Sequence, residues 1–396
     1  MTIPVKKIST FCKTGSGGTP SRSNNAFFEN GTIPWVKSGE LKNRYITEVE
    51  EYITDLAVEK SSAKLVSKGS LLIAMYGATV GEVSQLTFDA TTNQAICNIQ
   101  PDENVCDVNY LYRFLEASKS YLLSRRVGGG QPNISQGVIK DLDVPLPPLA
   151  EQRRIASILD QADELRQKRQ QAIEKLDQLL QATFIDMFGD PVSNPKGWDK
   201  LTIEKMLNNE KYSLKRGPFG GALKKEIFVE SGYLVYEQYH ALNNDFSFQR
   251  YFIDEDKYKE LKAFNVKPKD IIVSCSGVNL GRLAEVPEGS PAGIINQALL
   301  KISLNQSIIL NDIFIDIFMH PSFKKAFYGD FRGAAIPNFP PMSVFKEFEF
   351  IVPPLEIQKK YQSVKSQVKA LQKNHQLADE MNLFSSLQNQ AFNGTL

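Results

Sequence analysis

The sequence is poor in the residues that build metal sites and disulfide frameworks. Its 396 residues include four cysteines and three histidines, and neither a CxxC nor an HExxH pattern occurs. Structural zinc sites and small disulfide scaffolds need such spacings. We therefore expect no metal site, and we expect Cys12, Cys97, Cys106 and Cys275 to be reduced thiols in a cytoplasmic protein.

The sequence also lacks an excess of charge of one sign and any long apolar run. The 46 Lys and Arg residues against 45 Asp and Glu residues give a formal net charge of +1. This balance neither demands nor excludes a nucleic-acid partner, because acidic residues elsewhere can offset a basic face. No apolar stretch approaches the roughly 18 residues of a membrane span, and the start MTIPVKKIST has no signal-peptide core. We expect no membrane association.

Motifs of the common enzyme classes are missing as well. There is no GxxxxGK[ST] and no GxSxG, and the glycine-rich segment 15–22 lacks the lysine of a phosphate-binding loop. The FxGxG and Asn-Pro-Pro-aromatic motifs of adenine methyltransferases are absent, and the acidic run 254–256 is typical of a solvated loop. These absences favour a non-catalytic chain without a cofactor of its own.

One long amphipathic segment dominates the middle of the sequence. Pro147 and Pro148 form an extended lead-in to a helix, and Gly189, Asp190 and Pro191 end it. In between, apolar or small residues recur every three or four positions, which predicts a coiled-coil seam. About forty helical residues would form a rod of roughly 60 Å. The seam consists of Ile155, Ile158, Ala162, Leu165, Ala172, Leu176, Leu179 and Thr183, with Arg169 as a polar interruption.

The same segment occurs again near the end of the sequence. PPLAEQRR at 147–154 aligns with PPLEIQKK at 353–360, although Ile357 stands where the first copy has Glu151. Two rods with matching seams can pair along their length. The second seam consists of Tyr361, Val364, Val368, Leu371 and Ala378, with His375 at the position of Arg169 as a polar layer that fixes the register.

The segments between the rods are repeated too. KGSLLIAMYGATVGEV at 68–83 matches KPKDIIVSCSGVNLGRL at 267–283, NQAICNI matches NQALLKI, and the later matches keep this order. Strand signals dominate without a βαβ rhythm, which predicts an α+β fold with a mostly antiparallel or mixed sheet. We expect two homologous mixed α/β domains, 1–146 and 191–352, and two long helices, 147–190 and 353–396, that pair as an antiparallel coiled coil.

Polar, glycine-rich loops at matching places in both domains are the best candidates for binding. Glycine lets a backbone approach phosphates, Lys and Arg neutralise them, and Arg, Asn and Gln can pair with base edges. An ordinary surface turn explains each loop equally well, but their paired occurrence favours binding. The candidate DNA-binding residues are Thr19, Ser21, Arg22, Lys37, Arg44, Thr79, Arg125, Arg126, Gln131, Asn133, Lys215, Arg216, Lys224, Gln238, Asn279, Arg282, Arg332 and Asn338.

The order of these motifs resembles the specificity subunit of type I restriction-modification systems. The resemblance covers essentially the whole chain, and PPLxEQ followed by a long helix is its most specific part. It is carried by GGTPS at 17–21, GEL at 39–41, the glycine segment 77–81, NQA, GGGQPNIS and PLPPLAEQRRIASILD, then by GW at 197–198, GPFGGALK at 217–224 and VPPLEIQ.

The resemblance implies that each block is a target-recognition domain for one half of a split, asymmetric double-stranded DNA site. The helices would fix the gap between the half-sites and dock two methylation subunits. Restriction or translocase subunits would complete the complex, and S-adenosylmethionine, ATP and Mg would belong to these partners.

Three alternatives remain open at the level of sequence. The same DNA recognition could serve a methylation-only or phage-exclusion system. A structural coiled-coil adaptor would show no salt-dependent DNA binding. An enzyme with an unrecognised site would modify or cleave DNA without partners.

Overall fold

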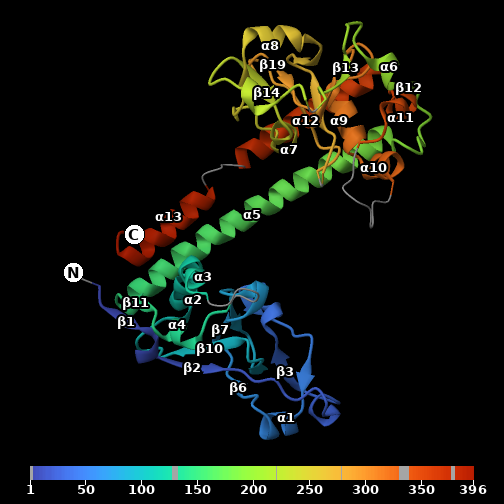
Figure 1. Ribbon diagram of the computed structural model, residues 1–396. Helices are drawn as coiled ribbons and strands as arrows, with labels where there is room; N and C mark the ends of the chain where they lie inside the picture. The colour runs from blue at the N-terminus through green and yellow to red at the C-terminus, as the bar shows by residue number, and fades with distance from the viewer. Residues whose placement is uncertain (1–2, 127–132, 220, 278, 330–338, 376–379) are drawn as a thin grey trace. The chain divides into compact units, whose positions relative to one another are not determined.

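The computed structural model describes residues 3–126, 133–219, 221–277, 279–329, 339–375 and 380–396, which divide into two compact units (Figure 1). Unit 1 comprises residues 1–171 and 376–396, and unit 2 comprises residues 172–375. The helix α5, Leu149–Phe188, contributes its first part to unit 1 and its last part to unit 2. It ends where Gly189 adopts a positive φ of 76°, as the glycine signal in the sequence predicts.

The described residues of unit 1 form three sheets, which are mainly antiparallel, although β4 pairs with β8 and β3 with β9 in parallel. The five-stranded sheet has the order β2 (Cys12–Ser16), β10 (Ile96–Pro101), β7 (Leu71–Ala74), β8 (Val83–Leu86), β4 (Tyr45–Ile46). The four-stranded sheet has the order β5 (Tyr52–Ile53), β3 (Ile33–Val36), β9 (Ala90–Thr92), β6 (Leu65–Val66). A separate pair joins β1 (Val5–Lys7) to β11 (Asp143–Pro145).

Unit 2 repeats the order of four strands in each of these two sheets, but among its described residues the larger sheet has no counterpart of β4. Its larger sheet has the order β13 (Leu214–Arg216), β20 (Leu299–Ile302), β17 (Ile271–Ser274), β18 (Leu283–Glu285). Its second sheet has the order β15 (Phe252–Ile253), β14 (Tyr233–Tyr236), β19 (Gly293–Ile295), β16 (Asn265–Val266), again with one parallel pair, β14 with β19. The pair β12 (Lys200–Thr202) with β21 (Glu349–Ile351) corresponds to β1 with β11.

Short helices surround the sheets in both units. The other α-helices of unit 1 are α1 (Asp55–Lys60), α2 (Val108–Ala117), α3 (Lys119–Ser124), α4 (Gln136–Lys140) and α13 (Glu380–Asn393). Those of unit 2 are α6 (Ile203–Met206), α7 (Gln238–Asn243), α8 (Glu255–Glu260), α9 (Asn311–Met319), α10 (Pro321–Tyr328), α11 (Met342–Glu347) and α12 (Leu355–His375).

The main core of unit 1 lies between the five-stranded sheet, α2, the start of α5 and α13. Phe392 of α13 packs edge-on against Tyr110 and Phe114 of α2, with ring centroids 5.5 and 5.4 Å apart. In unit 2 the end of α5 takes the corresponding place, since Phe184 and Phe188 belong to its main core. The helix α13 is therefore the counterpart in unit 1 of the end of α5 in unit 2.

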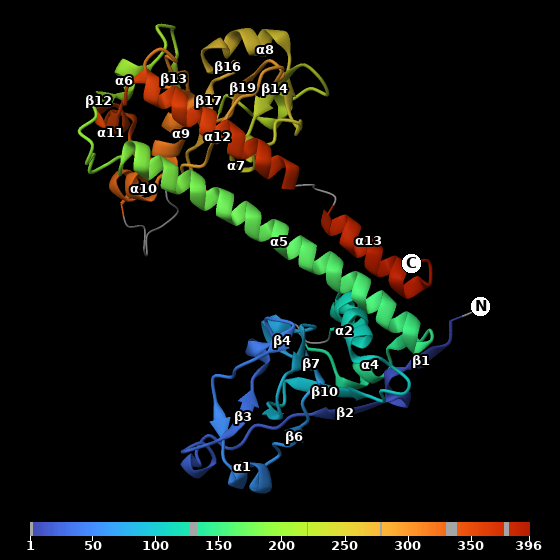
Figure 2. The ribbon, with the colours of Figure 1, turned by 180° about the vertical axis from the view of Figure 1, so that it is seen from behind.

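The long helices pair in antiparallel fashion within each unit (Figure 2). In unit 1, Arg154 near the start of α5 donates to the Leu396 carbonyl, and Arg166 lies over the ring of Phe384 in α13. In unit 2, Gln372 of α12 donates to Asp177, while Phe188 further along α5 packs against Tyr361, nearer the start of α12. The expected fold class, two mixed α/β domains with an antiparallel helix pair, is confirmed.

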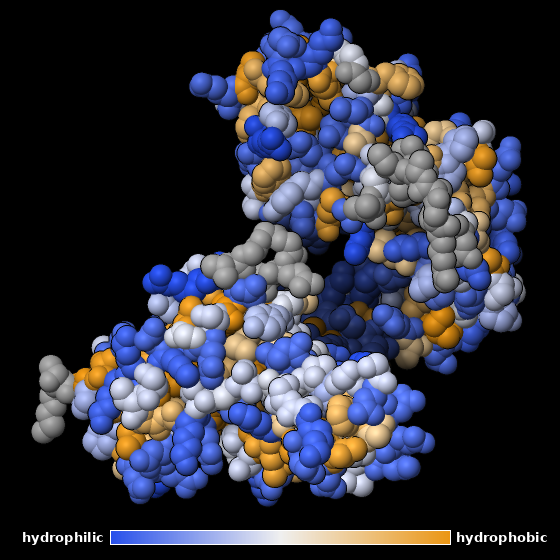
Figure 3. All heavy atoms as spheres, turned by 60° about the horizontal axis from the view of Figure 1, so that its bottom comes forward, coloured by the Kyte–Doolittle hydropathy of each residue, from blue (hydrophilic) through white to orange (hydrophobic). Residues whose placement is uncertain are grey.

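Polar residues cover most of the face seen in Figure 3, and apolar residues lie in small scattered groups. Within the described ranges, no helix combines the length and apolar character needed to cross a membrane. The same residues contain no cluster of three or more His, Cys, Asp or Glu that could hold a metal ion.

Candidate nucleic-acid interface

The glycine loop of each unit is held against the neighbouring NQ turn by close backbone contact. The Gly17 amide donates to the Ile96 carbonyl at 3.2 Å, and a Cβ atom at Gly17 would lie 2.2 Å from the Thr92 oxygen. In unit 2, a Cβ atom at Gly217 would lie 1.8 Å from the Asn296 oxygen. No real side chain fits at such distances, so glycine is required at both places.

Further loops gather at the same end of the larger sheet in unit 1. The Met75 amide at the end of β7 donates to the Ala95 carbonyl, and the Ile134 amide donates to the Met75 carbonyl. Tyr76 forms a bridge with Asn133, and Thr19 bonds the side chain of Gln94. The structure thus brings the predicted residues Thr19, Thr79 and Asn133 to one edge, with Ser21 in the same loop as Thr19.

Unit 2 assembles its loops in the same way. The Cys275 amide donates to the Ala298 carbonyl, and the Phe339 amide donates to the Cys275 carbonyl. Lys215 and Arg216 of β13 lead into the glycine loop, and Asn279 and Arg282 follow β17. The predicted residue Gln238 is engaged internally, because its amide nitrogen donates to Ser274 at 2.8 Å and to the Ser276 carbonyl at 2.9 Å.

An aromatic side chain on the unit 2 loop escaped the sequence-based selection. Phe219, between Gly217 and Lys224, is 95% exposed. The corresponding loop position of unit 1 is occupied by the polar Thr19, so the two units present different side chains on the same backbone frame. A single Phe in a polar loop carries no periodicity signal, which is why sequence reasoning passed over it.

Several predicted phosphate-binding cations have internal partners. Arg22 lies over the rings of Phe28 and Trp35 and pairs with Glu51 at 2.7 Å. The remaining contacts are Lys37 with Glu50 and Glu51, Lys215 over the rings of Tyr212 and Phe264, Arg125 over Tyr121, and Arg126 with the Leu123 carbonyl. Lys224 and Arg282 are exposed at the surface. A DNA contact by any of these cations stays a prediction.

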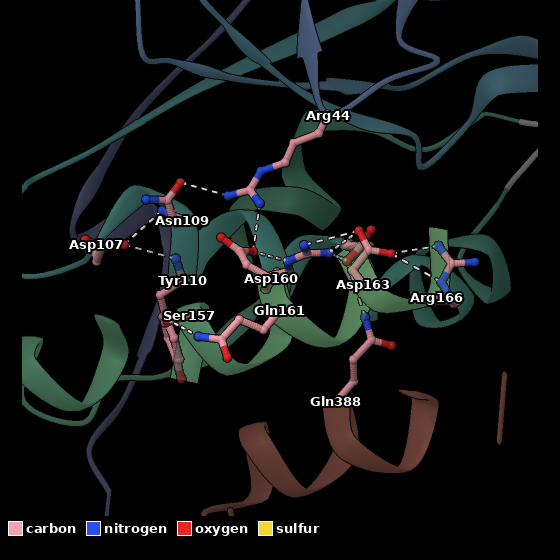
Figure 4. Close-up of polar contacts among 12 residues, drawn as sticks. Arg44, Asp107, Asn109, Tyr110, Ser157, Asp160, Gln161, Asp163, Arg166 and Gln388 are labelled. Carbon is pink, nitrogen blue, oxygen red and sulfur yellow. Dashed lines mark hydrogen bonds and ion pairs between the residues drawn. The ribbon is translucent and has the colours of Figure 1, made fainter. Parts of the chain in front are cut away.

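Arg44, another predicted DNA-binding residue, has side-chain partners on the long helix and on α2. Its guanidinium pairs with Asp160 of α5 at 2.7 Å and donates to the Asn109 side chain of α2 at 2.9 Å (Figure 4). Because these partners hold the group between the domain and the long helix, we assign Arg44 to the attachment of the domain.

The neighbouring Arg113 of α2 forms the centre of this attachment. It is 1% exposed and contacts Asp160 at 2.7 Å, Asp163 at 3.2 Å and Glu116 at 2.9 Å. Burial alone would raise the pKa of the Asp163 carboxyl, but hydrogen bonds and charges of Arg166 and Arg113 bring that pKa below its ordinary value. A buried cation on the domain helix thus meets carboxylates on the long helix.

Unit 2 makes the same attachment with the opposite polarity. Lys365 of the long helix α12 is 5% exposed and pairs with Asp316 at 2.8 Å and Asp312 at 3.1 Å, both on the domain helix α9. The Tyr361 hydroxyl donates to Asp316 at 2.7 Å. Here the long helix carries the cation and the domain helix carries the carboxylates.

A buried glutamine of the PPLxxQ motif clamps the domain helix in unit 1. The Gln152 oxygen accepts from the Asp107 amide at 2.9 Å, just before α2. Its nitrogen donates to the carbonyl of Val105 at 3.0 Å and to that of Pro147 at 2.8 Å. One side chain therefore ties the start of α5 to the start of α2.

Gln358 makes the same three bonds in unit 2. Its oxygen accepts from the Leu310 amide at 2.8 Å, and its nitrogen donates to the carbonyls of Ile308 at 3.0 Å and Pro353 at 2.7 Å. The sequence repeat aligned the two glutamines without assigning them a role. The repetition of a glutamine four residues after the second proline of each lead-in was the signal that could have revealed the clamp.

The predicted seam residues are distributed unevenly over the helix surfaces. Ile155, Tyr361 and Val368 are buried, while Leu165 and Leu371 are exposed. Ile158, Ala162, Arg169, Leu176 and Val364 are partly buried. The predicted residues Gln131, Arg332 and Asn338 and the side chain of His375 lie outside the described part of the structure.

Comparison with known proteins gives a consistent family pattern. Residues 2–175 match the family model described as type I restriction modification DNA specificity domain. Over 384 residues, 91% of this chain and 85% of the relative, the sequence is 27% identical to a type I restriction enzyme MjaIX specificity subunit of Methanocaldococcus jannaschii. It is 32% identical over 168 residues, 41% of either chain, to the EcoR124I/EcoR124II specificity subunit of Escherichia coli.

Solved structures share the fold over the full length. A chain from a study of complex assembly and conformational transition of the type I R-M system has a TM-score of 0.61 at 15% identity, with both chains fully covered. The type I restriction-modification S subunit from M. genitalium has a TM-score of 0.58 at 16% identity, covering 99% of this chain and 96% of the other.

Proposed function

Because the chain belongs to the specificity subunits of type I restriction-modification systems, we propose that each of its two units reads one half of a two-part DNA site. The chain serves sequence-specific DNA recognition and is not an enzyme. The proposal concerns how recognition is divided between the units.

The repeated loop frame carries this proposal. Both units set a glycine loop, an NQ turn and a third loop at the same end of the larger sheet. The side chains on that frame differ, with Thr19 in unit 1 and the exposed Phe219 in unit 2. Two DNA-binding domains with the same backbone frame and different surface side chains are expected to recognise two different half-sites. The spacing of the half-sites then follows from the geometry of the protein.

The long helix α5 is proposed to fix the gap between the half-sites. Its 40 residues form one continuous helix of about 60 Å that enters both units. Unit 1 is anchored on α5 by the Gln152 clamp and the Arg113 ion pairs. The attachment of a domain to a continuous helix supports a fixed length of DNA between the half-sites, with no sequence recognition in that gap.

Two methylation subunits are proposed to dock on the long helices. Leu165, Leu179 and Ile185 of α5 and Leu371 of α12 are exposed apolar side chains, which a partner could cover. Restriction or translocase subunits would join the same complex in the cytoplasm. S-adenosylmethionine, ATP and Mg would bind to these partner subunits. A methylation-only system would use the same recognition without a nuclease.

Single-molecule sequencing of genomic DNA tests the proposal. We would express this chain in cells with and without its cognate methylation subunit and map the modified bases. A two-part motif with a constant gap, methylated only when both proteins are present, is expected. A continuous motif would overturn the division between the units, and methylation by this chain alone would overturn its non-catalytic role.

A further inference from the structure

Unit 2 contains a lysine-lined hollow that DNA recognition by the loops does not use. It has a volume of about 550 Å³ and opens beside the start of β13, at the end opposite to the Gly217 loop. Five lysines and two glutamates line it, together with Ser213 and Ser303. The lysines are Lys211, Lys259, Lys262, Lys267 and Lys301.

The buried Lys301 forms the floor of this hollow. It lies within β20 and is 4% exposed. Its ammonium donates to the Asn265 carbonyl at 2.7 Å and approaches the Asn265 side-chain oxygen at 3.4 Å. Both acceptors are neutral and belong to one residue, although an ammonium has three donors. Burial lowers the pKa of Lys301, as expected for a cation without a directly bonded carboxylate.

The charges around the hollow leave a surplus of cations. Glu210 pairs with Lys267 at 2.6 Å, and Glu260 pairs with Lys257, outside the lining, at 2.8 Å. The buried Asp270 accepts from the Lys267 amide and from the Ser303 hydroxyl, and its charge opposes the effect of burial on the pKa of Lys301. Within the described residues, Lys211 and Lys262 have no carboxylate partner at ion-pair distance. These two cations can therefore turn to a bound anion.

The fold itself does not require this arrangement, because unit 1 lacks it. In the matching ladder positions, Asn98 stands where unit 2 has Lys301, and Leu65 stands where it has Asn265. The position of Lys262 corresponds to Ser62. The buried cation is thus found in one copy of the repeated sheet, together with the amide side chain of Asn265.

The backbone at the rim is also unusual. Tyr212 has a φ of 70°, a conformation that aromatic residues rarely adopt, and its ring lies under the ammonium groups of Lys211 and Lys215. Strained residues of this kind cluster at ligand sites, where the surrounding structure maintains them. We propose that this hollow binds a phosphate group, held by the ammonium groups of Lys211, Lys262 and Lys301.

Phosphate fits these partners better than a carboxylate does. Its oxygens point in several directions, as the lysines around a concave site do, and lysine binds phosphate as a point charge. The group could come from free inorganic phosphate or pyrophosphate, or from the backbone of a DNA duplex. The first source needs no DNA, whereas the second would add a contact without sequence preference.

Calorimetric titration of the full chain with pyrophosphate, at constant ionic strength, tests the site. The variant Lys211→Gln/Lys262→Gln removes two surface charges and keeps the buried Lys301. The control Lys200→Gln/Lys205→Gln removes two exposed charges of the same unit. We expect wild type and control to bind pyrophosphate and the first variant to bind it at least about tenfold more weakly.

A salt titration of duplex binding separates the two sources. If the Lys211/Lys262 variant also lowers DNA affinity and reduces the salt slope by about one, relative to the control, the phosphate belongs to DNA. Unchanged DNA binding with weakened pyrophosphate binding assigns the hollow to a free phosphate. The inference is overturned if the variant and the control behave alike in both titrations. Since the pyrophosphate arm needs no DNA, it is independent of the proposed reading of half-sites.

Discussion

The two units attach a domain helix to a long helix with the same clamp and opposite charges. In unit 1 the cation, Arg113, lies on the domain helix α2 and the carboxylates lie on α5. In unit 2 the cation, Lys365, lies on the long helix α12 and the carboxylates lie on α9. Arg113 lies six positions after Asp107, and Asp316 lies six positions after Leu310. Each charged residue is therefore equally far along the chain from the amide that the glutamine clamps.

The glutamine bonds hold each domain on its long helix, whereas the ion pairs determine which long helix a domain helix can pack against. The glutamine bonds use backbone groups, which are the same in every helix, so they cannot discriminate between the units. The ion pairs can discriminate, because the α2 helix on an α12-like surface would bring Arg113 towards Lys365. Like charges in a buried contact are strongly unfavourable. The duplicated parts of the chain thus retain one geometry and two mutually exclusive charge patterns.

Replacement of Arg113 by alanine should have the largest effect on the stability of unit 1. The change removes the buried cation, while Arg44 still pairs with Asp160 and Arg166 with Asp163. We therefore expect the free energy of unfolding of unit 1 to fall by about 3 kcal/mol, the lower end of the range for a broken buried pair. Urea unfolding followed by circular dichroism measures it. Arg126→Ala, an exposed change in the same unit, is the control. A loss below 1 kcal/mol would mean that the ion pairs contribute little to the attachment.

The two charges of the Lys365–Asp316 ion pair in unit 2 can be exchanged by mutation. Asp316→Lys and Lys365→Asp should each destabilise this unit, and the double variant should recover more than half of the summed loss if the pair acts directly. Since the Tyr361 hydroxyl also donates to Asp316, a recovery short of complete is expected. Additive losses would contradict a direct pairing.

The clamp should respond equally in the two units. Gln152→Ala and Gln358→Ala each leave one buried amide and two carbonyls without a partner, so we expect losses of about 2 kcal/mol in either unit. Unfolding curves of the two single variants measure this effect. Unequal losses, differing by more than the experimental error, would show that the charges and not the glutamines dominate one of the attachments.

The repeat made the fold largely predictable, while the contacts inside it were less so. The seam spacing and the Pro-Pro lead-ins predicted the long helix, and the matching strand signals predicted two similar α/β domains. The sequence could not indicate that Arg44 and Arg113 face α5, because an arginine in a loop or on a short helix has no periodic signature. Leu165 fits the heptad, yet it is exposed, since the buried face of α5 also includes Leu159 and Ala156.

Replacement of Phe219 by threonine should make the unit 2 loop more like that of unit 1. An exposed aromatic ring beside basic residues can pack against a thymine methyl group or wedge between base steps of a duplex, so we expect DNA affinity to fall by about 1 to 2 kcal/mol. Fluorescence anisotropy with a duplex that contains the mapped motif measures the change. Thr19→Ala is the matched variant in unit 1, and an equal loss there would argue against a special role for the ring.

The smallest expected difference between the units concerns pH. Burial lowers the pKa of His320, although the charge of Asp190 opposes this shift. A lowered folded-state pKa means that unit 2 loses stability as the pH falls from the ordinary histidine value near 6.5 towards the folded-state value. We expect less than about 1 kcal/mol, measured by urea unfolding between pH 7.5 and 5.5.

His320→Asn is the control for this titration, because asparagine can retain the cap on α10 and does not ionise. The variant should flatten the pH dependence of unit 2. All three histidines of the chain lie within the bounds of unit 2, so unit 1 should change little in this range. The same slope in wild type and variant would exclude His320 as its origin.

The place of Phe392 in the core of unit 1 has a consequence for synthesis on the ribosome. The helix α13 is translated more than two hundred residues after α2, which it covers. At the usual rates of translation this interval lasts roughly 13 to 55 seconds. During that time the rings of Tyr110 and Phe114 lack their packing partner Phe392, whereas all core residues of unit 2 are translated within the same interval. The unit that begins first in the chain is therefore completed last, and until then chaperones can bind it.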